Sequence, residues 1–333
     1  MKRRKSSRKS LSSKLWAKLI CIAAVLLAAL FYNVSPQDIL NGNFGKSRYA
    51  VESAVEIPPS PMREEGMVRV CIWNVHCYLD TYRMKNGRRI KSPKPEDEKM
   101  ELVRIIKSIN PDVLGIEEIG GLPYAREFVN LLSQNGLNYP YFVVSDESSE
   151  FPQCAILSKI KFEKTNHLAE RLFEYFGEKT RSPRGMLIAD FKTNGKDWRF
   201  GSIHLKSKFG AKARDKENNL MRQKEAEEIS KDISSYIKKG GMIIIGGDFN
   251  EEPSDGAIKI LKEKAGFVHL PQAGQDGTSF SYLWDKKNER RQFDFFLVSP
   301  AMKSRAKDAT VLPVIKSASD HAPVYTDLDF SRN

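Results

Sequence analysis

Six short stretches of the sequence place polar side chains at or near the ends of apolar, strand-like runs. In three of them the polar groups are amides and carboxylates. VRVCIWNVHCY leads to Asn74, PDVLGIEEIG to Glu117 and Glu118, and MIIIGGDFNEEP to Asp248 and Asn250. Such oxygen atoms are the ligands that Mg²⁺ prefers, and function on α/β scaffolds usually lies at strand ends. A cation-assisted reaction is therefore one chemistry that these residue types allow.

The other three stretches carry histidine and aspartate. RFGSIHLKSK ends an apolar run at His204, RQFDFFLVS holds Asp294 inside one, and SASDHAPVYTDL begins one with Asp320 and His321. A turn or a cap explains most of these stretches when each is taken alone. Asp294 differs, because a carboxylate inside a buried strand is costly unless it has a partner. Six such stretches in one chain are hard to explain as turns.

The order of these motifs resembles the endonuclease/exonuclease/phosphatase superfamily, with its deoxyribonuclease I-like fold, and in particular the exported bacterial nucleases of that superfamily. The resemblance covers essentially all of residues 67–329, and IEE, GDFN and SDH are its most specific parts. It implies an α/β fold, a four-layer sandwich in which two packed mixed β-sheets are flanked by helices. It also implies a hydrolase that cleaves phosphoric esters with Mg²⁺, or with Mn²⁺ or Ca²⁺ in its place.

The resemblance implies a role for the oxygen-bearing motif residues. Glu118, helped by Asn74 and Asp320, resembles the metal site of the superfamily, where the cation neutralises charge that grows on the phosphoryl oxygens. Asp248 and Asn250 are expected to orient the attacking water and to hold the reacting phosphoryl oxygens.

The histidines receive roles in the same way. His321 and Asp294 resemble a His–Asp dyad, in which the carboxylate fixes the imidazole tautomer and stabilises its cation. His204 corresponds to a second active-site histidine, either a proton donor to the leaving oxygen or a phosphate contact, and Arg184 to a phosphate-contacting arginine. The carboxylate that partners this histidine in related sequences is missing here, and Glu150 is the nearest substitute.

Two basic segments favour a nucleic acid as the substrate. One spans residues 83–94 and includes Arg88 and Arg89, and the other spans residues 206–216 and includes Lys206 and Lys208. Clustered cations that follow motif residues are expected near the metal end, where they would bind phosphates. The main alternative is a membrane-tethered phospholipid phosphodiesterase of the sphingomyelinase type, and a non-catalytic binding module of the same fold is a third reading. No protein partner is expected, and the chain is expected to be a monomer.

The first 34 residues resemble a membrane-targeting segment. Eight basic residues and no acidic residue lie within residues 1–18, and LICIAAVLLAALFY follows. The pattern predicts a signal-anchor whose basic end stays in the cytoplasm, or a cleaved signal peptide. Residues 35–66 are interrupted by proline and glycine and are predicted to be a linker. The enzyme domain is therefore expected over residues 67–330 outside the cytoplasm, membrane-anchored in the first case and secreted or periplasmic in the second.

The chain of 333 residues is 41% hydrophobic and 29% charged, which allows a large buried core. Apolar residues at helical spacing predict helices over residues 96–109 and 215–239. Nine strands are predicted, over residues 67–73, 113–116, 141–145, 154–157, 185–191, 199–205, 242–246, 292–298 and 323–329. Many strands with few helices favour two packed sheets. Cys71 is expected to be a buried thiol, and a disulfide between Cys77 and Cys154 is left open.

Overall fold

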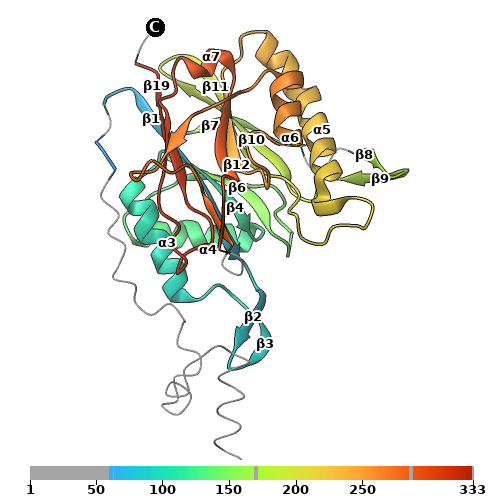
Figure 1. Ribbon diagram of the computed structural model, residues 1–333. Coiled ribbons are helices and arrows are strands. Elements are labelled where there is room, and N and C mark those ends of the chain that lie inside the picture. Colours follow the sequence, from blue (N-terminus) through green and yellow to red (C-terminus); the bar gives the residue numbers. More distant parts are fainter. Residues whose placement is uncertain (1–59, 63, 169–171, 285–287, 332–333) are drawn as a thin grey trace, which may run out of the picture. The chain divides into compact units, whose positions relative to one another are not determined.

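A computed structural model describes residues 60–62, 64–168, 172–284 and 288–331 (Figure 1). The predicted membrane-targeting segment and most of the predicted linker lie outside the described residues. None of the helices in the described part of the chain combines the length and the hydropathy needed to span a bilayer. The chain divides into two compact units. Among the described residues, Arg83–Ile90 belongs to the smaller unit, and the others belong to the larger one.

The first sheet of the larger unit has seven strands, with β1 at its centre. β1 runs antiparallel to β19 and parallel to β4, so the sheet is mixed. Almost every residue of β1 up to Val75 is buried, as expected for a strand that is covered on both faces. In spatial order the strands are β14 (Gln272–Ala273), β18 (Ala309–Val311), β19 (Val324–Asp329), β1 (Met67–Tyr78), β4 (Val113–Ile119), β6 (Gln153–Ser158) and β5 (Tyr141–Val144).

The second sheet has six strands and is also mixed. β11 and β12 are parallel, so the chain must cross over between them, and α5 (Asn219–Lys238) provides that crossover. The other neighbouring strands are antiparallel. In spatial order the strands are β13 (Val268–His269), β17 (Asp294–Val298), β12 (Ile243–Asp248), β11 (Lys196–His204), β10 (Gly185–Thr193) and β7 (Phe162–His167).

Helices cover the outer faces of the two sheets, which gives four layers (Figure 1). α3 (Glu96–Ile109) and α4 (Leu122–Gln134) share a buried apolar cluster with the first sheet. α5 and α6 (Gly256–Ile260), with the helical turn Leu261–Ala265 that follows, share another with the second sheet. A third cluster fills the space between the sheets. The predicted fold class, an α/β sandwich of two packed mixed sheets flanked by helices, is confirmed.

Short elements complete the described part of the chain. α7 consists of Pro300–Lys303, and a 3₁₀ turn of Lys216–Asn218 precedes α5. Three pairs of strands form small two-stranded sheets: β2 (Thr81–Lys85) with β3 (Arg88–Ser92), β8 (Leu172–Tyr175) with β9 (Glu178–Arg181), and β15 (Tyr282–Trp284) with β16 (Glu289–Arg291).

All nine predicted strands are present, although several have different ends. The helix predicted over residues 96–109 has those bounds. The second predicted helix begins later, because the Asp215 carboxylate accepts hydrogen bonds from the backbone nitrogens of Leu220 and Met221 at 2.8 and 3.0 Å and so caps the helix from outside it. The possible disulfide between Cys77 and Cys154 is not formed, because both residues are thiols.

Gly246 of β12 lies where the two sheets approach each other. A Cβ at this position would be 2.5 Å from Cδ1 of Phe296 and 3.1 Å from Cδ1 of Ile72. We expect Gly246→Ala to overpack this core and to lower the free energy of unfolding by about 1–3 kcal/mol, measured by urea denaturation. Gly256→Ala is the matched control, because its Cβ would meet only the far end of the Gln223 side chain. An equal loss in both variants would contradict this account of the packing.

Candidate active site

Strand alternation brings the motif residues into the space between the two sheets. Ile72 of β1 belongs to the cluster that fills this space, and the next side chain on the same face of the strand is that of Asn74. In the second sheet the register pairs His204 with Asp248, and Asp248 with Asp294. These three side chains therefore form one row across β11, β12 and β17. The row and Asn74 meet where the apolar core ends.

The Asp248 carboxylate lies at the centre of the site, surrounded by hydrogen-bond donors and imidazoles. Its Oδ2 accepts hydrogen bonds from Nδ2 of Asn74 and Nδ2 of Asn250, both at 3.1 Å, and its Oδ1 accepts one from the backbone nitrogen of Asn250. Two imidazoles also face Oδ2, with Nε2 of His204 at 3.3 Å and Nε2 of His321 at 3.8 Å. Burial acts to raise the pKa of Asp248, but the charge of His321 and the hydrogen bond from His204 lower it below its usual range. The carboxylate is therefore ionised at neutral pH.

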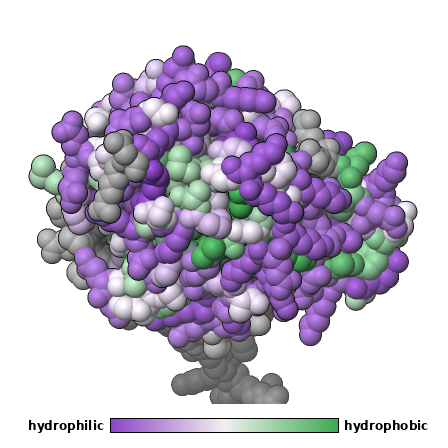
Figure 2. Space-filling view, turned by 90° about the horizontal axis from the view of Figure 1, so that it is seen from above, coloured by the Kyte–Doolittle hydropathy of each residue, from purple (hydrophilic) through white to green (hydrophobic). Residues whose placement is uncertain are grey.

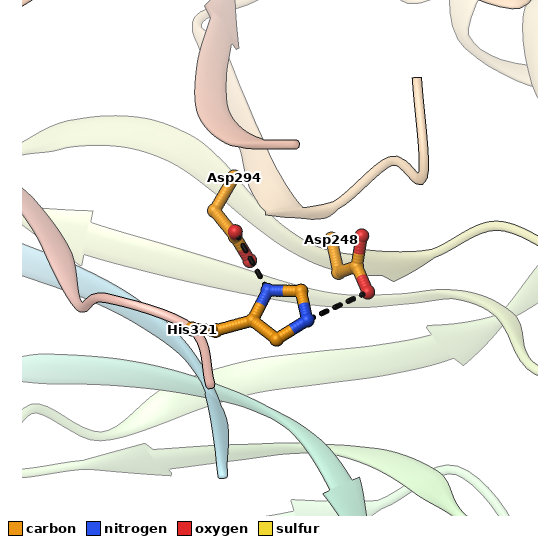
Figure 3. A group of neighbouring side chains, drawn as sticks. All are labelled: Asp248, Asp294 and His321. Atoms are coloured by element: carbon orange, nitrogen blue, oxygen red, sulfur yellow. Dashed lines mark hydrogen bonds and ion pairs between the residues drawn. The ribbon is translucent and has the colours of Figure 1, made fainter. Parts of the chain in front are cut away.

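Asp294 holds His321 from the opposite side (Figure 3). Nδ1 of His321 lies 2.8 Å from Oδ2 of Asp294, and the Ser281 hydroxyl donates to the same oxygen at 2.7 Å. Asp294 is fully buried, and its Oδ1 has no hydrogen-bond partner within the described residues. The structure thus places an imidazole and a hydroxyl where the sequence argument required a partner for this carboxylate.

The electrostatics of the pair favour a proton on the imidazole. Burial raises the pKa of Asp294. Burial alone would lower the pKa of His321, but the carboxylates of Asp294 and Asp248 raise it well above its usual value. The bond to Asp294 fixes the ring, and Nε2 is left to face Asp248. An imidazole held in this way is oriented to give a proton to, or take one from, a group that enters the site.

His204 is enclosed at the end of β11. Burial and the positive charge of Arg184 lower its pKa, which favours the neutral ring, and its Nδ1 has no hydrogen-bond partner within the described residues. The carboxylate that faces this histidine is Asp248. Glu150 is exposed and forms an ion pair with Lys91 at 3.3 Å. The sequence-based choice of Glu150 as the partner of His204 was therefore wrong.

Glu118 lies one residue before the end of β4 at the same site and is suited to a cation. Burial acts to raise the pKa of its carboxyl, but the interactions with His204, His76 and Arg184 and the hydrogen bond from Cys77 lower it to about 2. Its Oε2 accepts a hydrogen bond from the backbone nitrogen of Cys77 at 3.0 Å, whereas its Oε1 accepts none from the described residues. An ionised carboxylate with an available oxygen is the kind of ligand that Mg²⁺ binds.

The other two predicted metal ligands are held by His76. Oδ1 of Asn74 accepts a hydrogen bond from the backbone nitrogen of His76 at 3.0 Å and retains a second lone pair. Asp320 is partly exposed, and its Oδ1 lies 3.8 Å from Nδ1 of His76. These oxygen atoms, together with the Glu118 carboxylate, fit the hard donor set that the sequence predicted.

A second group of possible ligands consists of Asp248, Asp294 and His321, whose ligand atoms all lie within 4.8 Å of one another (Figure 3). His321 and Asp294 already bond to each other, so a cation among the three would have to displace that hydrogen bond. Because Asp294 is fully buried, breaking this bond would leave it without its imidazole partner. The arrangement therefore fits a His–Asp pair better than a metal site.

Four non-glycine residues at the site have left-handed backbone conformations. The φ values are 50° for His76, 57° for Cys77, 63° for Glu118 and 53° for Asn250. Such values are uncommon outside glycine, and strained residues tend to gather at functional sites. His76 and Cys77 lie at the irregularity near the end of β1, Glu118 at the one near the end of β4, and Asn250 two residues after β12. At each of these places a motif side chain enters the site.

Three of the predicted substrate-binding residues lie on the same side of the site as His204. Arg184 is close enough to lower the pKa of His204, and its Nη2 donates to the backbone oxygen of Leu205 at 2.8 Å. Lys206 is half-buried, and burial followed by the charge of Arg184 lowers its pKa. Lys208 forms an ion pair with Glu217 at 3.3 Å.

The remaining two, Arg88 and Arg89, are exposed residues of β3. They belong to the smaller unit. They are not among the side chains that the structure brings together, and their part in substrate binding stays a prediction.

Two serines that support the site were missed in the sequence. Ser281 holds Asp294, as described above, and nothing in FSYLW distinguishes it from an ordinary strand residue. The Ser319 hydroxyl donates to the backbone oxygen of Asn74 at 2.7 Å and accepts from the backbone nitrogen of His321 at 3.0 Å. Ser319 directly precedes the Asp-His pair of SDH, so its position in the motif was a usable signal.

Comparisons with known proteins identify a family and several similar folds. The family model described as Endonuclease/Exonuclease/phosphatase family matches residues 71–321. No curated protein matches the chain. Among solved structures, a mutant of beta toxin from Staphylococcus aureus with bound magnesium ions has a TM-score of 0.55 at 16% identity, with 78% of this chain and 98% of that chain covered.

Two further solved structures have similar scores. The human Nocturnin catalytic domain with bound sulfate has a TM-score of 0.56 at 17% identity, with 81% of this chain and 98% of that chain covered. D. rerio TDP2 complexed with single strand DNA product has a TM-score of 0.50 at 17% identity, with 79% of this chain and 99% of that chain covered. At these identities the likeness shows a shared fold.

We expect Asp294→Asn to lower the pKa of the His321 imidazole, because it removes one of the two carboxylates that raise that pKa. The imidazole signals can be followed by NMR during a pH titration of the folded variant and of the wild type. His269, whose pKa burial lowers to about 4, is the internal control and should not change. An unchanged pKa of His321 would contradict the pairing with Asp294.

Proposed function

We propose that this chain, which belongs to the Endonuclease/Exonuclease/phosphatase family, is a metal-dependent phosphodiesterase and, more specifically, a nuclease that acts outside the cytoplasm. The observation that carries the proposal is the row of His204, Asp248 and Asp294 with His321 closing it. It combines an ionised carboxylate, a charged imidazole and a second, neutral imidazole in one buried site. These groups can orient a water molecule and transfer protons during the hydrolysis of a phosphoric ester.

In this proposal each group at the row has one task. The Asp248 carboxylate and the Asn250 amide accept and donate hydrogen bonds that orient the attacking water. Nε2 of His321 exchanges a proton with the reacting oxygen, while Asp294 keeps the opposite ring nitrogen engaged. His204 is neutral, so it has a single N–H, which faces Asp248 in the free protein and donates instead to a phosphoryl or leaving oxygen that enters the site. Arg184 adds positive charge beside it.

Glu118, with Asn74 and Asp320, would hold the divalent cation, with Mg²⁺ as the first choice and Mn²⁺ or Ca²⁺ as alternatives. The cation supplies Lewis-acid neutralisation of the charge on the phosphoryl oxygens. The low pKa of Glu118 supports this assignment, because the carboxylate is ionised at neutral pH without the metal. The bound magnesium of the similar beta toxin structure also supports it.

The basic residues support a nucleic acid as the substrate. Lys206 and Lys208 follow His204 directly, and the exposed Arg88 and Arg89 provide a second group of cations. The similar TDP2 structure holds a single strand DNA product. The basic and apolar segment at residues 1–34 supports a position outside the cytoplasm, tethered to the membrane or released after cleavage. We propose a monomer without a protein partner.

One observation favours a second candidate, a phospholipid phosphodiesterase of the sphingomyelinase type. β15 and β16 form a hairpin, and Trp284 on it is 40% exposed. An exposed tryptophan on a hairpin is suited to the interface between water and lipid. The two strands of this hairpin are only three residues long, which is too short for a periodic pattern to predict them.

A panel of substrates decides between the two candidates. We expect the full-length protein to cleave DNA or RNA in the presence of Mg²⁺ and to lose this activity in EDTA. Cleavage of sphingomyelin vesicles without cleavage of any nucleic acid would favour the lipid enzyme. Full activity in EDTA would contradict metal dependence for either substrate.

Glu118→Gln tests the metal site directly, because it keeps the shape of the side chain and removes its charge. We expect a higher Mg²⁺ concentration for half-maximal activity and a loss of turnover of at least about tenfold. Glu263→Gln, at an exposed carboxylate on the outer helical layer, is the matched control. Equal Mg²⁺ requirements in the two variants would remove Glu118 from the metal site.

A variant in which Arg88, Arg89 and Lys91 are all replaced by alanine tests whether the β2–β3 hairpin contacts the substrate. Phosphate contacts release counterions, so each lost contact should reduce the salt slope of duplex binding by about 0.9. The triple variant should raise KM more than it lowers kcat, because these contacts are made in the ground and transition states alike.

The control for this triple variant removes the same charge elsewhere, with alanine at Lys231, Lys238 and Lys239 near the end of α5. Initial rates of cleavage of a labelled duplex at several salt concentrations compare the two variants with the wild type. If the two triple variants have the same salt slope, the hairpin does not contact the substrate.

A further inference from the structure

Phe209 is an exposed aromatic residue close to the candidate active site. Its side chain is 88% exposed, and it follows His204 by five residues in the chain. The face of the molecule in Figure 2 is mostly hydrophilic, and the apolar areas on it are small. A single exposed apolar side chain requires no explanation by itself. Phe209 differs because the backbone beneath it is held in place.

Side chains from two directions fix the loop that carries Phe209. Nζ of Lys206 donates to the backbone oxygen of Phe209 at 2.9 Å. The buried Asn218 amide donates to the backbone oxygens of Phe209 and Ser207 at 3.1 and 2.7 Å. Gly210, with a φ of 68°, forms the turn directly after it. A ring presented from such a loop has little conformational freedom to lose when it binds a partner.

Two cations next along this loop are held over aromatic rings. Nζ of Lys212 lies 5.3 Å from the ring centre of Tyr175, and the guanidinium of Arg214 lies 4.4 Å from that of Phe176. Both rings belong to the end of the β8–β9 hairpin, and the Tyr175 hydroxyl donates to Asp215 at 2.9 Å, which ties the hairpin to the loop. The loop and the hairpin together present one aromatic ring followed by two oriented positive charges.

We propose that Phe209 stacks on an unpaired base of a single-stranded nucleic acid whose phosphates contact Lys212 and Arg214. This inference rests on the proposed nuclease function and specifies its substrate. A stacking ring needs an open base face, and a duplex interior does not offer one, so a single strand or an unpaired end is required. Aromatic rings interleaved with cations are the usual surface for such strands.

A lipid surface fits these residues less well. Membrane binding depends on the apolar area that enters the bilayer, and here the cations lie over the rings of Tyr175 and Phe176. Phe209 alone would offer one ring. The positive charges of Lys212 and Arg214 beside it suit a phosphate backbone, because successive phosphates of one strand can contact them.

The test uses the full-length enzyme and single-stranded oligonucleotides in which one abasic site is moved along the strand. Phe209→Ala should raise KM on the intact strand about tenfold, with little change in kcat. Phe209→Trp should retain the wild-type KM. At one position the abasic site should raise the KM of the wild type and leave that of Phe209→Ala unchanged, because the stacking partner is already lost.

Tyr141→Ala is the matched control, because Tyr141 is an exposed aromatic residue far from the site. It pairs with Ser158, which pairs with Val113 at the start of β4, whereas the site lies at the other end of that strand. If Phe209→Ala has the same KM as the wild type, or responds to every abasic position as the wild type does, the stacking proposal is wrong. Loss of binding to anionic vesicles with unchanged cleavage of nucleic acid would also overturn it. A wild-type enzyme that cleaves no nucleic acid would overturn the nuclease function itself, which separates the two failures.

Discussion

The burial of an ionised carboxylate between two sheets is the constraint on which this site depends. Asp248 is 2% exposed, and a charge so placed is costly unless donors surround it. Its partners come from both sheets: Asn74 from β1, and His204 from β11. The stability of this end of the molecule and the chemistry of the site therefore rest on the same hydrogen bonds. A change that separated the sheets would remove both.

The alternation of side chains along the strands brings these partners together. In β11, Phe200 and Ser202 lie on the face that turns toward the other sheet, and two residues later the same face carries His204. β17 runs antiparallel to its neighbour β12, so the polar residue comes first there, and Asp294 precedes Phe296 on that face. Apolar packing between the sheets thus sets the direction of every polar side chain at their end. The packing of the core and the orientation of the site have one cause.

This alternation also explains how much could be predicted from the sequence. Strong periodicity placed all nine predicted strands, and the cost of burying Asp294 predicted a partner for it. Apart from the pair of His321 and Asp294, which the resemblance implied, contacts between distant segments could not be predicted. Ser281 directly precedes the short strand β15, in a stretch without a recognisable pattern. The partner of His204 proved to be Asp248 rather than Glu150, because the register of β11 with β12 decides it. Capping by Asp215 moved the start of α5 for a local reason, because helical periodicity does not show which nearby side chain caps the first turn.

The two neighbouring carboxylates of IEE show how far the local structure controls chemistry. Glu117 points between the sheets, where the Ser202 hydroxyl donates to its Oε1 at 2.7 Å and burial raises its pKa well above the usual range. Glu118, with its left-handed backbone, turns toward positive charges that lower its pKa to about 2. One residue is therefore a neutral acid in the core and the next an anion in the site. Identical side chains have pKa values shifted in opposite directions, because the backbone places them in different surroundings.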